Sequence, residues 1–149
     1  MNNLTFPAYP FRLQGEGDNR RIFDEVRKKW LKLSPEEWVR QHLVMYLHHV
    51  LGYPLTLMSL EKEIRSATRS LRPDLVVYNR SGNPVLLAEC KAPHVKTGNE
   101  TFAQAAAYNR HFKVPFLLIT NGISHYCARI DPEAGSFAFL ESIPTFEEL

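Results

Sequence analysis

The chain has 149 residues, of which 44% are hydrophobic and 23% are charged, and its formal net charge is +2 at pH 7. This length and composition predict one globular domain over residues 1–149 and exclude disordered and fibrous chains. The mildly basic balance permits nucleic-acid binding without requiring it. We find no signal-like segment and no apolar run long enough to cross a bilayer, so we expect a cytoplasmic protein without membrane contacts.

Two segments precede the first clear helix signal. Residues 1–19 carry Pro and Gly without a sustained hydrophobic period, which predicts an extended N-terminal arm over the domain. Three aromatic residues are the candidate anchors of this arm: Phe6, Tyr9 and Phe11. Residues 20–32 can form either a short strand or a helical turn. Three consecutive cations in this segment can be a solvated face or can contact phosphates: Arg27, Lys28 and Lys29.

The next segment begins as a helix should. Ser34 stands at the N-cap and is followed by proline, with Glu37 at the third helical position, so a capping box is expected. The helix should run to about Leu51 and end at Gly52. Its period predicts that Glu36 projects onto the buried stripe and that Glu37 lies off it. The apolar members of this stripe are Val39, Leu43, Leu47 and Val50.

A first strand is predicted over residues 55–64. Within it, Glu61 is a further acidic residue with an expected exposed position. A short basic link follows, which can be a solvated turn or a second phosphate-contacting patch. Its cations are Arg65, Arg69 and Arg72.

Two β-rich runs, residues 72–78 and 84–91, are joined by a turn that contains Gly and Asn, which predicts a hairpin. Side chains alternate along a strand, so Glu89 and Lys91 share one face. Antiparallel pairing can bring Asp74 across from Glu89. Two carboxylates and an ammonium at one hairpin end suit a divalent cation and the water that it activates.

The second half of the chain predicts one helix and three strands. The helix covers about residues 99–112, and one of its faces contains Thr101, Gln104, Ala105, Tyr108 and Phe112. Strands are expected at 114–120, 125–130 and 137–140. Cys90 and Cys127 lie in apolar strands without metal-type spacing, so we expect core thiols.

Four motifs together resemble a known family. They are Arg72-Pro73-Asp74, Glu89-Cys90-Lys91-Ala92-Pro93, Gln104-Ala105-Ala106-Ala107-Tyr108-Asn109 and Thr120-Asn121-Gly122. Over about residues 20–130 the chain resembles the N-terminal nuclease domain of type I restriction enzyme R subunits, of the PD-(D/E)xK superfamily, in its short stand-alone form. The resemblance implies an α/β fold with a restriction-endonuclease-like core, in which helices flank a mixed central β-sheet.

The resemblance also implies roles for particular residues. Asp74, Glu89 and the backbone carbonyl of Cys90 would hold Mg²⁺ or Mn²⁺, because hard cations take oxygen ligands. Lys91 would orient or deprotonate the attacking water. Glu36 would face the site from the first helix, unless it serves only as a carboxylate at a helix N-terminus.

Gln104 and Tyr108 would border the same site by this resemblance. Their alternative role is structural, as a core tyrosine beside a satisfied glutamine. The catalytic group has a structural alternative too, in which Glu89 and Lys91 form an ion pair at a strand end and Asp74 is an acid in a turn.

The predicted function is therefore a metal-dependent DNA endonuclease. The alternative is a non-catalytic DNA-binding or assembly module that works with helicase, methyltransferase or specificity subunits encoded elsewhere. A nuclease that acts on RNA or on structured ends is a third possibility. The sequence lacks the G-x-x-x-x-G-K-S/T pattern, so we expect no P-loop motor within these residues.

Overall fold

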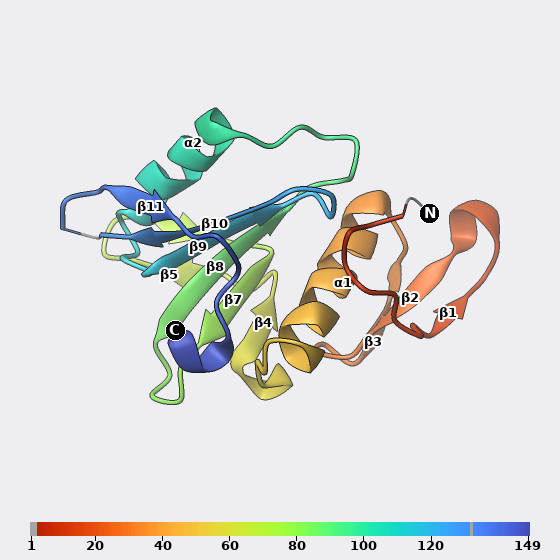
Figure 1. Ribbon diagram of the computed structural model, residues 1–149. Helices are drawn as coiled ribbons and strands as arrows, with labels where there is room; N and C mark the ends of the chain where they lie inside the picture. Colours follow the sequence, from red (N-terminus) through yellow and green to blue (C-terminus); the bar gives the residue numbers. More distant parts are fainter. Residues whose placement is uncertain (1–2, 132) are drawn as a thin grey trace.

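A mixed six-stranded sheet forms the centre of the computed structural model, which describes residues 3–131 and 133–149 (Figure 1). The strand order is β11-β10-β9-β8-β7-β4. The strands are β4 (Met58–Leu60), β7 (Leu75–Tyr78), β8 (Pro84–Cys90), β9 (Phe116–Thr120), β10 (His125–Ile130) and β11 (Phe137–Phe139). Only β8 and β9 run parallel among these neighbours. The predicted α/β fold with a mixed central sheet is confirmed.

The two helices cover opposite faces of this sheet. Helix α1 (Pro35–His49) packs with the side chains of Leu75, Val77 and Leu86. Helix α2 (Asn99–Asn109) packs on the other face, against Val76 and Leu87 among others. Because successive strand side chains point to opposite faces, the two continuous apolar runs of the hairpin supply both cores. The parallel β8–β9 pair requires a crossover, and α2 provides it.

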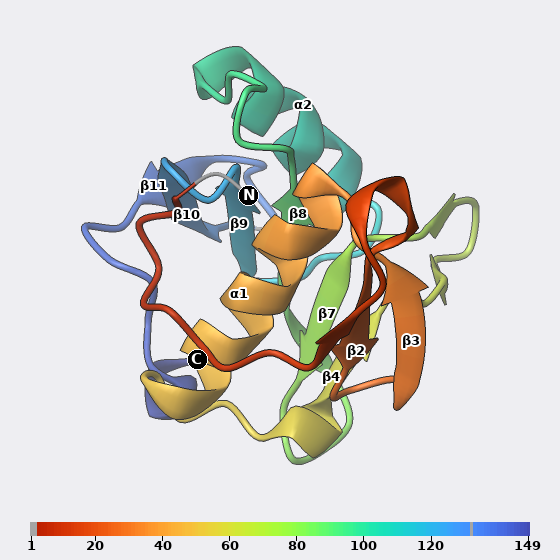
Figure 2. The ribbon, with the colours of Figure 1, turned by 90° about the vertical axis from the view of Figure 1, so that its right-hand side faces the viewer.

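A second, smaller sheet covers the far side of α1 (Figure 2). Its strands, in the order β1-β2-β3, are β1 (Leu13–Gln14), β2 (Arg21–Asp24) and β3 (Lys29–Lys32). Residues 20–32 therefore form a complete hairpin, rather than the single strand or helical turn that the sequence predicted. Helix α1 is consequently enclosed between two sheets.

The N-terminal arm runs along α1, as Figure 2 shows. Phe6 is buried, and the backbone N–H of Thr5 donates to the carbonyl of Gly122 over 2.8 Å. Tyr9 and Phe11 are partly buried against the same core, so all three predicted anchors hold the arm. The end of the predicted arm is not extended throughout, since the strand β1 is followed by the 3-10 turn Gly17–Asn19. Residues 1 and 2 of the arm lie outside the described residues.

The sequence predicted the start of α1 and most of its buried stripe correctly, since Val39, Leu43 and Leu47 are buried, but it missed the burial of a second face. The Ser34 hydroxyl accepts a hydrogen bond from the backbone N–H of Glu37 over 3.0 Å. Glu37 itself is buried at 5% exposure, whereas Glu36 is exposed and Val50 is 53% exposed. The carboxylate of Glu37 pairs with Arg40 and forms no capping box. The small sheet explains the burial of Glu37, because it covers a face of α1 that would be exposed to solvent if the helix packed only against the central sheet.

Two further element predictions need correction. The segment 55–64 is not one strand: it forms a 3-10 turn (Leu55–Leu57), then β4, and then turns at Glu61, whose φ is 53°. Strands β5 (Ile64–Arg65) and β6 (Ser70–Leu71) form a small separate hairpin. Helix α2 ends at Asn109, three residues before the predicted end.

The remaining features of the fold are simple. A last 3-10 turn (Phe146–Glu148) lies near the C-terminus. Cys90 and Cys127 are free and buried, as expected.

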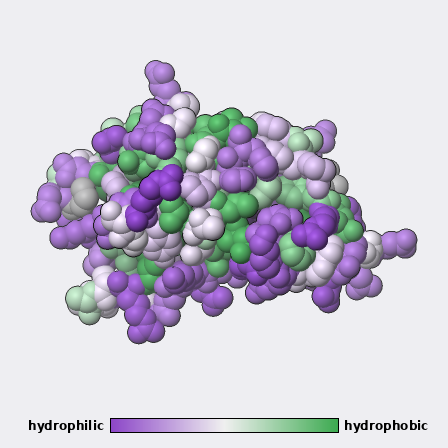
Figure 3. All heavy atoms as spheres, turned by 90° about the horizontal axis from the view of Figure 1, so that it is seen from below, coloured by the Kyte–Doolittle hydropathy of each residue, from purple (hydrophilic) through white to green (hydrophobic). Residues whose placement is uncertain are grey.

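Polar and apolar side chains are interspersed on the lower face of the molecule (Figure 3). Within residues 3–131 and 133–149, neither helix is both long and apolar enough to traverse a lipid bilayer.

Candidate active site

The β7–β8 hairpin brings the predicted acidic residues together. Leu75 pairs with Ala88 in the antiparallel register, so Asp74 and Glu89, each one residue further toward the same end, lie across from each other. Lys91 follows two residues after Glu89, and its backbone N–H donates to the carbonyl of Thr120 over 2.8 Å. The juxtaposition of Asp74, Glu89 and Lys91 that the sequence predicted is present.

Hydrogen bonds fix the carboxylate of Asp74. Its Oδ1 accepts from the Arg40 guanidinium over 2.9 Å, and its Oδ2 accepts from the backbone N–H of Cys90 over 2.7 Å. The side chain is only 14% exposed. Asp74 is thus tied both to α1 and to the end of β8, which leaves its orientation little freedom.

Glu89 is a carboxylic acid with an unusually high pKa. Burial, followed by the neighbouring Asp74 carboxylate, raises the pKa of Glu89 to about 8. Glu36 adds to this effect, while Lys91 opposes it. Two neighbouring, partly buried carboxylates repel each other, so ionising both costs free energy unless a cation binds between them.

Glu36 lies beside the same group. Its side chain is exposed, yet burial of the carboxylate by surrounding protein and the charge of Asp74 raise the pKa of Glu36. Arg40 and Lys91 act in the opposite direction. Glu36 therefore lies close enough to Asp74 and Lys91 for their charges to shift its pKa. It does not lie on the buried stripe of α1, where the sequence placed it.

Helix α2 contributes the two residues predicted to border the site. Gln104 and Tyr108 line a cavity of about 280 Å³ together with Glu89 and Lys91. Tyr108 is 37% exposed, and its hydroxyl donates to the backbone carbonyl of Ser70 over 2.7 Å. Tyr108 is therefore not a core tyrosine. The core side of α2 consists of Phe102, Ala106 and Asn109.

Sequence reasoning missed the central role of Arg40. Its side chain is 7% exposed, and besides Asp74 it donates to Glu37 over 3.0 Å and to Glu61 over 3.0 Å. Burial would lower the pKa of Arg40, but the hydrogen bonds that Arg40 donates to Glu37 and the charges of the surrounding carboxylates raise it above its ordinary value. The only sequence signal for this cluster is the i,i+3 spacing of Glu37 and Arg40.

Arg27 extends this cluster into the small sheet. Its Nε donates to the buried carboxylate of Asp24 over 2.7 Å, and it lies 3.6 Å from Glu37. Gln41 links Asp24 and Glu37 by hydrogen bonds of 3.1 and 2.9 Å. Arg27 is thus neither part of a solvated face nor available to phosphates. Lys28 is exposed, which fits both of the alternatives given for it.

The oxygen donors fit a divalent cation of the magnesium type. Among the described residues, no group of three or more His, Cys, Asp or Glu side chains is arranged to hold a metal ion. Mg²⁺ needs fewer protein ligands than three, since it usually binds one or two carboxylates and keeps several waters. Asp74 and Glu89 supply two carboxylates, and the raised pKa of Glu89 marks a place where a cation would relieve repulsion.

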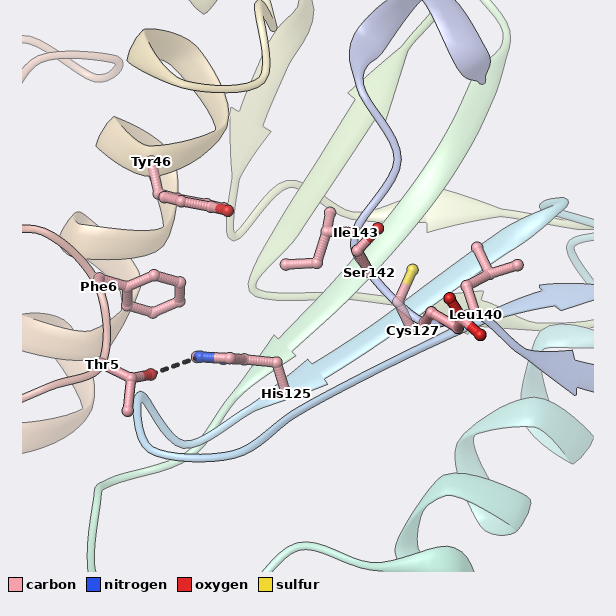
Figure 4. Close-up of a pocket in the computed structure, with 9 residues that line it drawn as sticks. Thr5, Phe6, Tyr46, His125, Cys127, Leu140, Ser142 and Ile143 are labelled. Carbon is pink, nitrogen blue, oxygen red and sulfur yellow. Dashed lines mark hydrogen bonds between the residues drawn. The ribbon is translucent and has the colours of Figure 1, made fainter.

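A second cavity, of about 340 Å³, lies between the arm, α1 and β10 (Figure 4). Both ring nitrogens of His125 bond to hydroxyls there, to Thr5 and to Thr120, over 2.6 Å each. Burial lowers the pKa of His125 and raises the pKa of Cys127 to about 12. These two groups are therefore uncharged at neutral pH.

Fold and site together define an α/β domain with a mixed sheet and a carboxylate–lysine group at one hairpin end. A solved structure shares this fold with a TM-score of 0.52 and 20% sequence identity. It is a fragment assigned as the HsdR subunit of a type I restriction enzyme from Vibrio vulnificus YJ016. The likeness covers 78% of our chain but 24% of that one, so our chain spans about a quarter of it.

The sequence itself places the chain in a family. Residues 35–144 match the family model of the type I restriction enzyme R protein N terminus, and the chain belongs to this family. No curated protein matches it. The matched range contains Asp74, Glu89 and Lys91 together with both helices.

Proposed function

We propose that this domain is a metal-dependent endonuclease of the PD-(D/E)xK type that hydrolyses phosphodiester bonds in DNA. The observation that carries the proposal is the meeting of Asp74, Glu89 and Lys91 at one hairpin end, where Glu89 has a pKa of about 8. Strongly shifted carboxylates beside a charge partner are typical of functional sites. The family relation supports DNA as the substrate.

Mg²⁺ or Mn²⁺ is the cofactor that we propose. Asp74, Glu89 and the backbone carbonyl of Cys90 would hold it. When bound, such an ion neutralises charge on a phosphate and makes water a better nucleophile. Binding requires the deprotonated form of Glu89, so metal affinity should rise with pH.

The other residues have positioning and proton-handling roles. Lys91, the first residue after β8, lines the same cavity as Glu89 and would orient or deprotonate the attacking water. Arg40 holds Asp74 in place from α1. Glu36 adds negative charge that would favour a cation, and Gln104 and Tyr108 border the space beside Lys91.

One observation favours the alternative of a DNA-binding or assembly module. Both oxygens of Asp74 already accept hydrogen bonds, from Arg40 and from the backbone of Cys90. This arrangement satisfies the carboxylate without a metal. Such a module would work with helicase, methyltransferase or specificity subunits.

Cleavage by single-site variants separates the two functions. The proposal predicts that Lys91→Ala keeps the fold and the metal affinity but loses DNA cleavage in Mg²⁺ or Mn²⁺. Glu63→Ala, which changes an exposed carboxylate paired only with Arg65, should cleave like the original chain. Cleavage that survives Lys91→Ala, or that a chelator does not affect, would contradict the proposal.

A further inference from the structure

The cavity beside Lys91 has an apolar floor, and we call it the α2 pocket. The floor consists of Leu87 from β8 and of Leu117 and Ile119 from β9, each only 2% exposed. Leu71 from β6 closes one side. Its volume of about 280 Å³ lies at the lower end of ligand pockets, which suits one small planar group.

Helix α2 forms the opposite wall and carries the polar groups. Gln104 is exposed at the pocket, so its amide offers both a donor and an acceptor to a ligand. The Tyr108 ring is held by the hydrogen bond to Ser70 and by stacking on Phe112, with ring centroids 5.9 Å apart. An oriented, partly exposed aromatic ring beside an amide is suited to a flat ligand with a polar edge.

The proposed catalytic group lies at this same pocket, because Glu89 and Lys91 are part of its lining. A ligand in the pocket therefore has the Lys91 ammonium group and the Glu89 carboxylate as its neighbours. On the other side, Arg69 and Arg72 flank the β6 strand and are exposed. The ligand that fits has a planar apolar body, a hydrogen-bonding edge and anionic groups on both sides, which describes a base within a nucleic-acid strand.

We infer that the α2 pocket binds one unstacked DNA base next to the phosphate that is cleaved, and this inference rests on the proposed function. A base within a duplex is stacked and paired and cannot enter such a pocket unless it is extruded. The site therefore prefers single-stranded or locally unpaired DNA. Stacking on Tyr108 is tolerant of sequence, while Gln104 contacts the base edge.

The test is binding of short dye-labelled oligonucleotides by fluorescence anisotropy in a chelator, where no metal-dependent cleavage occurs. The chain should bind a single strand more tightly than the duplex, and removal of one base to leave an abasic site should weaken binding by about fivefold or more. Ala105→Trp, which fills the pocket, should weaken binding of the intact strand to the level of the abasic strand.

Two further variants control this result. Ala103→Trp adds the same side chain to an exposed position of α2 outside the pocket and should bind like the original chain. Gln104→Ala changes an exposed residue and should weaken binding even if Ala105→Trp fails to fold. Two results would overturn the base pocket. One is equal affinity for the single strand and the duplex, and the other is equal affinity of folded Ala105→Trp and Ala103→Trp for the single strand.

The outcome is separable from that of the nuclease proposal. Metal-dependent cleavage without pocket-dependent binding overturns the base pocket and leaves the nuclease standing. Pocket-dependent binding without cleavage in any divalent metal confirms the pocket and overturns the nuclease, which would make this a module for single-stranded DNA.

Discussion

The protonation of Glu89 links the stability of the chain to pH. Its pKa of about 8 in the folded state lies above the ordinary value of 4.5. Between these two pH values the folded chain holds a proton that the unfolded chain has lost. The free energy of unfolding therefore falls as the pH rises from about 4.5 to about 8.

Glu89→Gln should remove this dependence. The variant should match the original chain near about pH 4 and exceed its free energy of unfolding near about pH 8, because the amide cannot acquire the unfavourable charge. Urea denaturation across this range measures the difference. Glu63→Gln, at an exposed site, should follow the original chain throughout. Parallel curves for Glu89→Gln and the original chain would contradict the pKa that we assign to Glu89.

At the scale of residues, the sequence predicted those positions that follow from the regular spacing of side chains along a strand or a helix. Strand alternation and hairpin pairing placed Asp74 opposite Glu89, and helical spacing placed Gln104 and Tyr108 on a common face. The partners of Arg40 were not predictable in this way, since Glu61 and Asp74 lie 21 and 34 residues away along the chain. Their meeting depends on how α1 docks against the sheet.

At the scale of elements, Arg40 joins α1 to the β7–β8 hairpin. Arg40→Met should destabilise the chain by about 3–5 kcal/mol, because it removes the cation paired with the partly buried Asp74 and leaves the buried Glu37 with Arg27, 3.6 Å away, as its remaining partner. Denaturant unfolding measures the loss. Arg65→Met, which removes an exposed ion pair, should cost less than about 1 kcal/mol. Equal losses for the two variants would contradict the role of Arg40.

The N-terminal arm depends on a glycine. Gly122 has a φ of +85°, and an added Cβ would lie 2.8 Å from the Leu4 side chain and 3.1 Å from Val39. Gly82 has the same φ of +85° with nothing within 4 Å. Both Ala variants should therefore lose about 1 kcal/mol or more from backbone strain alone.

Only Gly122→Ala should also release the arm. We expect faster proteolysis within residues 3–11 for Gly122→Ala than for Gly82→Ala, measured by the cleavage sites and rates under native conditions. Identical proteolysis of the two variants would show that the contact between Gly122 and the arm contributes nothing.

Element boundaries show where sequence reasoning reached its limit. The Ser34 cap and the β7–β8 hairpin were predicted because their signals are local. The stripe of Val39, Leu43 and Leu47 was predicted correctly, but the burial of Glu37 was missed, since the period of a helix cannot indicate that a second sheet covers its other side. The prediction of one strand up to residue 64 was wrong because Glu61 adopts a positive φ, which a non-glycine residue seldom does, and this ends β4.

At the scale of the whole molecule, two sheets enclose α1 and so bring charges from distant segments to one hairpin end. Arg27 and Asp24 come from the small sheet, Arg40 comes from α1, and Asp74 comes from the hairpin. The composition predicted one globular domain, and the order of the elements with the family resemblance predicted the α/β fold, but only the tertiary arrangement shows how this ion-pair cluster surrounds the acidic site. The central claim is that this cluster presents Asp74 and Glu89 to a divalent cation.

Calorimetric titration with Mn²⁺ tests this claim most directly, because metal binding precedes any question of substrate. The account predicts binding to the original chain and to Glu63→Ala, with affinity that rises between about pH 6 and pH 8 as Glu89 loses its proton. Binding should vanish in the Asp74→Ala/Glu89→Ala double variant. Equal heats for the double variant and the original chain, or no heat from either, would contradict the account and favour the DNA-binding module.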